Sequence, residues 1–145
     1  MSKPGTTHIL KLCVGAERVE DLLDWQLTRR AQGPDGLPRH VTRMWPKRAD
    51  EVVNGGSLYW VFKGLILCRQ PILRFDPVDR GDGINRCGIV LDPSVIRVAA
   101  TPKRPFQGWR YLAPEDAPPD LRGNRAQQDP LPPQLESALA EIGVL

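Results

Sequence analysis

Two segments of the chain combine cationic and aromatic side chains, the residue types that bind nucleic acid. The first spans residues 29–48, where Asp35 is the one acidic residue among several arginines and a lysine. Cationic side chains bind a phosphate backbone, and an aromatic face stacks on a base. An alternative interpretation is a solvated basic edge whose tryptophan packs in the core. The candidate site residues of this segment are Arg43, Trp45, Lys47 and Arg48.

The second segment lies between Asp92 and Glu115 and contains no carboxylate. Its cations alternate with Phe106, Trp109 and Tyr111 in a region rich in proline and glycine. Such interleaving is what a platform for single-stranded nucleic acid requires. Alternatively, the aromatic residues fold back as a lid over the core. The candidate site residues of this segment are Arg104, Trp109 and Arg110.

The distribution of charge along the chain links the two segments. The formal net charge is +3, and much of the acid lies elsewhere, in residues 17–24 and from Glu115 onward. Like charges on one face repel each other, so this segregation favours an anionic partner over a gain in stability. We therefore predict that both segments contribute to one face that binds RNA or a nucleotide.

Candidates for catalysis are few, and no catalytic residue is assigned. His8 and His40 are the two histidines of the chain. His40 is a candidate acid or base near Arg43, but a surface histidine is the favoured interpretation. Cys68 and Cys87 lie within apolar runs, which predicts inert core thiols.

The sequence predicts neither a metal nor a cofactor. Asp76, Asp79 and Asp82 are spaced three apart, but they lack the alternating ligand positions and the closing glutamate of a calcium-binding loop, so turn chemistry is favoured. Gly55 and Gly56 could let the backbone approach a ligand closely, but a turn that requires positive φ is the favoured interpretation. They do not form a phosphate-binding loop, because no GxxxxGK[ST] motif is present.

Residues 42–72, TRMWPKRADEVVNGGSLYWVFKGLILCRQPI, resemble a family of alphaproteobacterial proteins of about this length, known as domain of unknown function 1489. The pieces that carry the resemblance best are RMWPKR at 43–48, GSLYWV at 56–61 and PFQGWRY at 105–111. The family implies no activity and no catalytic residues. A weaker resemblance is to the PUA-like superfamily of PUA, ASCH and EVE domains, which implies a small pseudo-barrel that binds RNA or modified bases.

Apolar spacing and turn residues predict the elements that must position these side chains. Val19, Leu22, Leu23 and Leu27 recur at helical spacing. Lys63-Gly64 is read as a tight hairpin turn and Pro71 as a bend or bulge. The predicted helices are 19–30, 49–53 and about 133–143, and the predicted strands are 8–14, 40–45, 57–63, 65–75, 87–91 and 95–99, with a proline-rich loop at about 113–133.

These elements predict an α+β fold. We expect a bent, mostly antiparallel sheet or a small PUA-like pseudo-barrel, with the first helix packed on it and a C-terminal helix. The 15 prolines disfavour long helices, and residues 1–145 are expected to form a single domain. No apolar run reaches the roughly 18 residues of a membrane span, and no secretory signal is visible. The widely spaced Cys13, Cys68 and Cys87 are expected to be reduced and buried in a cytoplasmic protein.

The leading hypothesis from sequence is therefore a module that binds RNA or a nucleotide. The alternative is an enzyme that acts on a small anionic or nucleoside-like substrate in a barrel-mouth pocket. A third hypothesis is an adaptor that uses its proline-rich tail as the contact. The sequence does not determine the oligomeric state.

Overall fold

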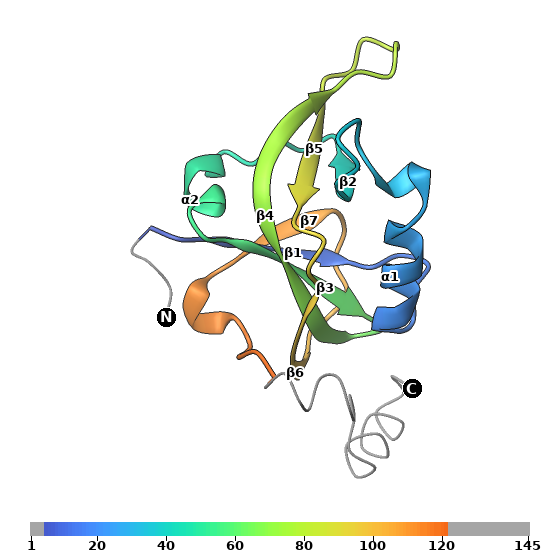
Figure 1. The fold of residues 1–145 in the computed structure, drawn as a ribbon. Coiled ribbons are helices and arrows are strands. Elements are labelled where there is room, and N and C mark those ends of the chain that lie inside the picture. Colours follow the sequence, from blue (N-terminus) through green and yellow to red (C-terminus); the bar gives the residue numbers. More distant parts are fainter. Residues whose placement is uncertain (1–4, 122–145) are drawn as a thin grey trace.

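A seven-stranded, curled half-barrel sheet dominates the computed structural model, which describes residues 5–121 except for the side chain of Arg30 (Figure 1). The few helices are short, and the architecture is α+β, as the sequence predicted. The elements are β1 (His8–Leu12), α1 (Val19–Gln26), η1 (Arg29–Ala31), β2 (Arg39–Thr42), α2 (Ala49–Val53), β3 (Ser57–Phe62), β4 (Leu65–Val78), β5 (Arg86–Leu91), β6 (Ile96–Pro102), β7 (Trp109–Leu112) and η2 (Pro114–Asp116).

Strand β4 is the centre of the sheet and crosses it as a long curved ribbon (Figure 1). Its first half pairs antiparallel with β3 and with β6, and its second half pairs antiparallel with β5. The register with β5 shifts between Ile72 and Arg74, directly after Pro71, where the sequence predicted a bend or bulge. This irregularity lets one strand belong to two differently oriented parts of the sheet.

Apart from β6, the strands follow the order β2-β5-β4-β3-β1-β7, in which β1 and β3 are parallel and β2 and β7 are the end strands. The chain after β7 then crosses to β6. There the N–H of Ala99 donates to the Pro119 carbonyl and the N–H of Leu121 donates to the Arg97 carbonyl, both at 2.9 Å. The crossing brings the chain that leaves one end of the sheet back onto β6, which is consistent with the curl.

Residues 101–121 are therefore more regular than the sequence predicted. The sequence predicted no strand between residue 99 and the proline-rich loop at about 113–133, whereas the structure contains β7 and η2 and pairs the end of this stretch with β6. Strand β7 was missed because it is only four residues long and because its buried side chains are divided between two cores, which hides the alternation of apolar and polar residues. The rest of the predicted proline-rich loop and the C-terminal helix at about 133–143 lie outside the described residues.

Strand β3 is buried on both faces and separates two hydrophobic cores. The first core contains Trp60 and Phe62 together with Val19 and Leu22 of α1. The second contains Tyr59 and Val61 together with Ile66, Val98 and Leu112. Because successive strand residues point to opposite faces, the apolar run of β3 supplies both cores at once.

Helix α1 is shorter than predicted, and its buried side differs from the predicted apolar stripe. It buries Val19, Leu22 and Gln26, whereas Leu27 is 80% exposed. The Thr28 hydroxyl donates to the Trp25 carbonyl at 2.6 Å, a local bond that competes with helix continuation. The helix ends at Gln26, and the predicted residues 27–30 are divided between loop and η1.

A buried amide pair fastens α1 to the sheet. Gln26 and Gln70 exchange hydrogen bonds, with Gln26 Nε2 2.6 Å from Gln70 Oε1 and Gln70 Nε2 2.8 Å from Gln26 Oε1. Trp60 Nε1 also donates to Gln70 Oε1 at 2.9 Å. Buried polar groups stabilise a fold when they are fully paired, so this network orients the helix without leaving an orphan donor.

The Lys63-Gly64 turn between β3 and β4 is confirmed. Lys63 has a φ of 44° and Gly64 a φ of 86°. Two consecutive residues with positive φ are typical of a type I′ hairpin, whose twist matches that of the flanking strands.

Candidate functional site

Strand β7 brings parts of the two predicted basic-aromatic segments together. Trp109 Nε1 donates to the Met44 carbonyl at 2.9 Å, and the N–H of Arg48 donates to the Tyr111 hydroxyl at 3.1 Å. Residues 44–48 therefore lie against the face of β7 that carries Trp109 and Tyr111. The sequence distance between the two segments concealed this contact.

The two tryptophans of the predicted site hold these segments in place. Trp109 is 4% exposed, belongs to the first core and meets the Tyr111 ring edge-on at 4.9 Å. Trp45 is half-buried against the same core, and its Nε1 donates to the Asn85 carbonyl at 2.9 Å. The Trp109 ring is closed to a base, and the Trp45 side chain is used largely for packing.

The cations of the predicted site divide into free and paired groups. Arg43, Lys47, Arg104 and Arg110 are exposed, and within residues 5–121 none of them pairs with a carboxylate. Arg110 lies over the Phe106 ring at 5.6 Å, on the opposite face of β7 from Trp109. Arg104 lies in the loop from β6 to β7, next to Lys103, whose N–H donates to Gly64 O at 2.8 Å.

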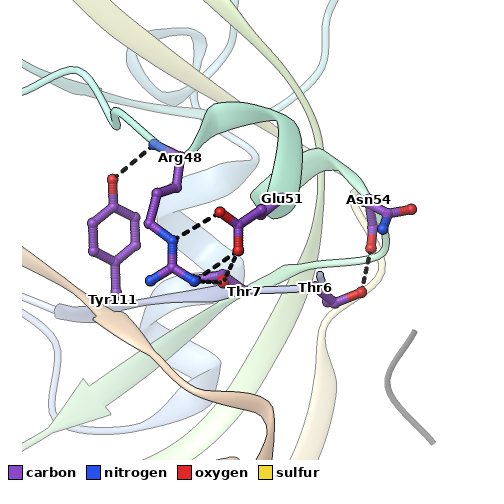
Figure 2. Close-up of polar contacts among 6 residues, drawn as sticks. All are labelled: Thr6, Thr7, Arg48, Glu51, Asn54 and Tyr111. Atoms are coloured by element: carbon purple, nitrogen blue, oxygen red, sulfur yellow. Dashed lines mark hydrogen bonds and ion pairs between the residues drawn. The ribbon is translucent and has the colours of Figure 1, made fainter. Parts of the chain in front are cut away.

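Arg48 is the paired member of the predicted site (Figure 2). Its Nη2 is 2.7 Å from Glu51 Oε1 and 2.7 Å from Thr7 Oγ1, and its guanidinium lies 5.1 Å from the centre of the Tyr111 ring. The hydrogen bond from Arg48 lowers the pKa of Glu51. Arg48 thus fastens α2 to β1 and β7, beside an open groove of about 650 Å³ that also contains Glu115.

Several arginines that are not among the predicted site residues are already neutralised by neighbouring carboxylates. The pairs are Arg18–Asp21, Arg69–Asp120, Arg74–Asp35, Arg86–Asp82 and Arg97–Glu20. Among the described side chains, the other cations without a carboxylate partner are Lys11, Arg29, Arg39, Arg80 and Lys103. Unpaired positive charge is thus concentrated in, though not confined to, residues 43–47 and 103–110.

His40, for which a surface position was favoured, lines a pocket instead. This apolar pocket, of about 290 Å³, is bounded by Lys11, Cys13, Trp25 and Trp60. The His40 ring meets the Trp60 ring edge-on at 5.9 Å. Burial, with a contribution from the Lys11 charge, lowers the pKa of His40 to about 4, so the imidazole is neutral near pH 7. Sequence reasoning missed the pocket because β1 and β2 are not neighbours in the sheet.

His8, to which the sequence assigned no role, is 7% exposed on β1. Its Nδ1 accepts a hydrogen bond from the N–H of Ser57 at 2.9 Å. The parallel pairing of β1 and β3 creates this contact, which no local pattern predicts.

The cysteines are free thiols, and burial raises their pKa values. Cys68 and Cys87 are buried as predicted, but Cys13 is only half-buried, at the rim of the apolar pocket. The pKa of Cys13 is raised to about 12 and that of Cys87 to about 11. These values keep both groups protonated near neutral pH, which makes them poor nucleophiles.

Asp79 and Asp82 accept hydrogen bonds from backbone N–H groups within a turn, as the sequence predicted. Asp79 accepts from the N–H of Gly81 at 2.8 Å, and Asp82 accepts from the N–H of Ile84 at 3.2 Å. Across residues 5–121, no cluster of three or more His, Cys, Asp or Glu side chains is arranged to hold a metal ion.

Glycine is required at positions 55 and 56 for two different structural reasons. Gly55 has a φ of 84°, as predicted for a turn. Gly56 was expected to share this conformation, but its φ is not in the left-handed region; instead, a Cβ there would lie 2.3 Å from the carbonyl oxygens of Thr7 and Val52. Gly56 therefore allows α2 to approach β1 at backbone distance, and the expectation of positive φ was wrong for this residue.

Comparison with known proteins identifies the family. A family described as "Protein of unknown function (DUF1489)" matches residues 9–145. The chain belongs to the DUF1489 family. No curated protein and no solved structure matches this DUF1489 chain. In the described part of the chain, helices are too short or too polar to cross a membrane.

Proposed function

We propose that this DUF1489 protein binds RNA, or a nucleotide, through exposed cations around β7. The observation that carries the proposal is that, among the described residues, Arg43, Lys47, Arg104 and Arg110 have no carboxylate partner, whereas five arginines elsewhere are ion-paired. Phosphate oxygens would supply the missing counter-charge.

The contacts around β7 divide the predicted site residues into two roles. Trp45, Arg48 and Trp109 position the segments, because their side-chain donors are used on Asn85, Glu51 and Met44. Arg110 lies on one face of β7, an end strand of the sheet, and the segment that carries Arg43 and Lys47 runs along the other face. An extended phosphate backbone that followed this strand would meet cations on either side.

This arrangement favours backbone contacts over recognition of bases. Contacts to phosphate position a nucleic acid but carry no sequence information. With the Trp109 ring buried, stacking at this position contributes nothing. We therefore expect weak sequence preference and a strong dependence on salt.

The first test is a titration of short RNA and single-stranded DNA, followed by fluorescence anisotropy at several salt concentrations. For single strands, the slope of log K against log salt is about 0.7 per neutralised phosphate. Engagement of all four cations predicts a slope of about 3 in magnitude. An absence of binding at low salt would contradict the proposal and favour the enzyme hypothesis.

A matched pair of double variants locates the surface. Arg104→Gln with Arg110→Gln should reduce the slope by about 1.4 and weaken binding at every salt concentration. The control, Arg29→Gln with Arg80→Gln, removes the same charge from two exposed cations that also lack a carboxylate partner in the described structure. Equal losses in both variants would show that net charge alone attracts the nucleic acid.

A further inference from the structure

A second pocket lies beneath the chain that follows β7. It has a volume of about 330 Å³ and lies between the second-core face of the sheet and residues 114–120. The sheet contributes His8 from β1, Tyr59 from β3 and Arg69 from β4. Register explains why they meet: Tyr59 pairs directly with Arg69, and β1 runs beside β3. The opposite wall contains Pro114, Ala117, Pro118, Pro119 and Asp120.

The hydrogen bond to Ser57 fixes which atom of His8 carries the proton. Since Nδ1 accepts from the Ser57 N–H, a neutral ring has its proton on Nε2. Burial and the nearby Arg69 charge both lower the pKa of His8, so the ring is neutral near pH 7. In this state His8 is a hydrogen-bond donor, because its one basic lone pair is already used. The geometry therefore disfavours His8 as a general base.

Tyr59 supplies a second donor beside it. The residue is 4% exposed, and its ring meets the His8 ring edge-on at 5.1 Å. Burial raises the pKa of Tyr59, which keeps the hydroxyl protonated. Within residues 5–121, neither Tyr59 Oη nor His8 Nε2 has a hydrogen-bond partner, and no fully buried side-chain nitrogen or oxygen lacks one. Both atoms are therefore open to solvent although their residues are almost completely buried, and both residues line the pocket.

Arg69 adds a cation whose hydrogen-bonding capacity is incompletely used. Its Nε and Nη2 donate to the two carboxylate oxygens of Asp120 at 2.8 and 2.7 Å, and its Nη1 donates to Ser57 Oγ at 2.8 Å. A guanidinium has five N–H donors, so donors remain after these three bonds. Both oxygens of Asp120 already face Arg69. The side chains that line the pocket thus leave donors unused, while the one carboxylate among them is already paired.

We propose that His8, Tyr59 and Arg69 form a binding site for a small oxyanion, a carboxylate or a phosphate group. Such a ligand offers several acceptor oxygens on one atom, which matches a pocket lined by donor-bearing residues from three strands. The proline-containing chain at residues 114–120 forms the outer wall, and the Arg69–Asp120 pair fastens that wall to the sheet. The inference is independent of nucleic-acid binding at β7.

The experiment follows the histidine ring nitrogens by long-range ¹H–¹⁵N NMR spectroscopy. Inorganic phosphate and acetate are titrated separately, with sodium chloride used to hold the ionic strength constant. The free protein should show His8 protonated on Nε2, and one of the two anions should shift the Nε2 signal saturably. His40 is the internal control and should not follow the same curve. Whichever anion binds more tightly identifies the chemistry of the ligand.

Tyr59→Phe removes one donor and retains the ring. Hydrogen bonds to charged groups contribute enough that affinity for the anion should fall about tenfold or more. Tyr111→Phe is the matched control, since its hydroxyl accepts from Arg48 outside this pocket. Backbone amide spectra verify that both variants fold. The proposal is overturned if neither anion shifts His8 saturably, or if Tyr59→Phe binds the anion as the unmodified protein does.

Discussion

The two histidines occupy comparable positions on strands, but their rings differ in hydrogen bonding. His8 and His40 lie on strands, each meets an aromatic ring edge-on, and burial lowers the pKa of each. His8 is held by the Ser57 N–H beside Arg69, whereas His40 has no hydrogen-bond partner in residues 5–121 and faces an apolar pocket. Burial makes both rings neutral, but only the hydrogen bond to His8 selects the atom that donates.

The surroundings of the two rings extend this difference. The apolar pocket lies beside α1, where Gln26, Gln70 and Trp60 satisfy one another. The pocket of His8 retains donors that find no acceptor within residues 5–121. Buried polar groups that pair with each other stabilise a fold, whereas donors left without a protein partner remain available to water or to a ligand.

The largest expected effect comes from Gly56→Ala, which disturbs the approach of α2 to β1 directly before His8. The added Cβ would lie 2.3 Å from two backbone oxygens, which side-chain rearrangement cannot relieve. We expect a loss of about 3 kcal/mol or more in the free energy of unfolding, measured with urea.

Gly55→Ala is the control for this change. Its Cβ would meet only Thr6 Oγ1, at 4.0 Å, so the cost is that of an alanine with positive φ, about 1–2 kcal/mol. Equal losses in the two variants would contradict this prediction, because the close backbone contact at Gly56 would then cost no more than the positive φ at Gly55.

The next effect is the pH dependence of stability, which should be dominated by His40. Its pKa is 6.5 when unperturbed and about 4 in the folded protein, so the unfolded chain binds the proton more readily. The contribution of neutral His40 to the free energy of unfolding is complete above pH 6.5. It is lost as the pH falls towards 4, by about 3 kcal/mol in total. Urea unfolding at a series of pH values measures this loss.

Replacing each histidine sharpens the comparison. His40→Phe should remove most of the slope between pH 6.5 and 4. His8→Phe should remove a smaller part, because the shift in the pKa of His8 has the same direction but is less pronounced. Slopes that change equally in the two variants would contradict the assignment to His40.

The sequence predicted those features that depend on local pattern. The Lys63-Gly64 hairpin and the short α2 follow from turn residues and local apolar spacing. The family was also recognised, because its motifs are contiguous in the chain. The extent of α1 was not predicted, since Leu27 fits the helical spacing but is exposed in the structure.

The candidate sites could be predicted only as residue types. The basic-aromatic segments were visible, but sequence cannot distinguish a buried Trp109 from an exposed one, or a free Arg43 from a paired Arg48. The pocket of His8 was missed altogether. It depends on the parallel pairing of β1 with β3 and on the return of residues 114–120 over the sheet, and neither leaves a local signal.

The smallest expected effect is a difference in thiol reactivity, which reports on the apolar pocket without altering stability. Cys13 lines this pocket and is half-buried, whereas Cys68 and Cys87 are buried in the sheet. With its pKa raised to about 12, Cys13 has little thiolate near pH 7 and should react slowly with a maleimide, but before the other two. Mass spectrometry of partially labelled, folded protein measures the order. Simultaneous labelling of all three would mean that the sheet opens as a unit, and the apolar pocket would then not be a permanent feature of the fold.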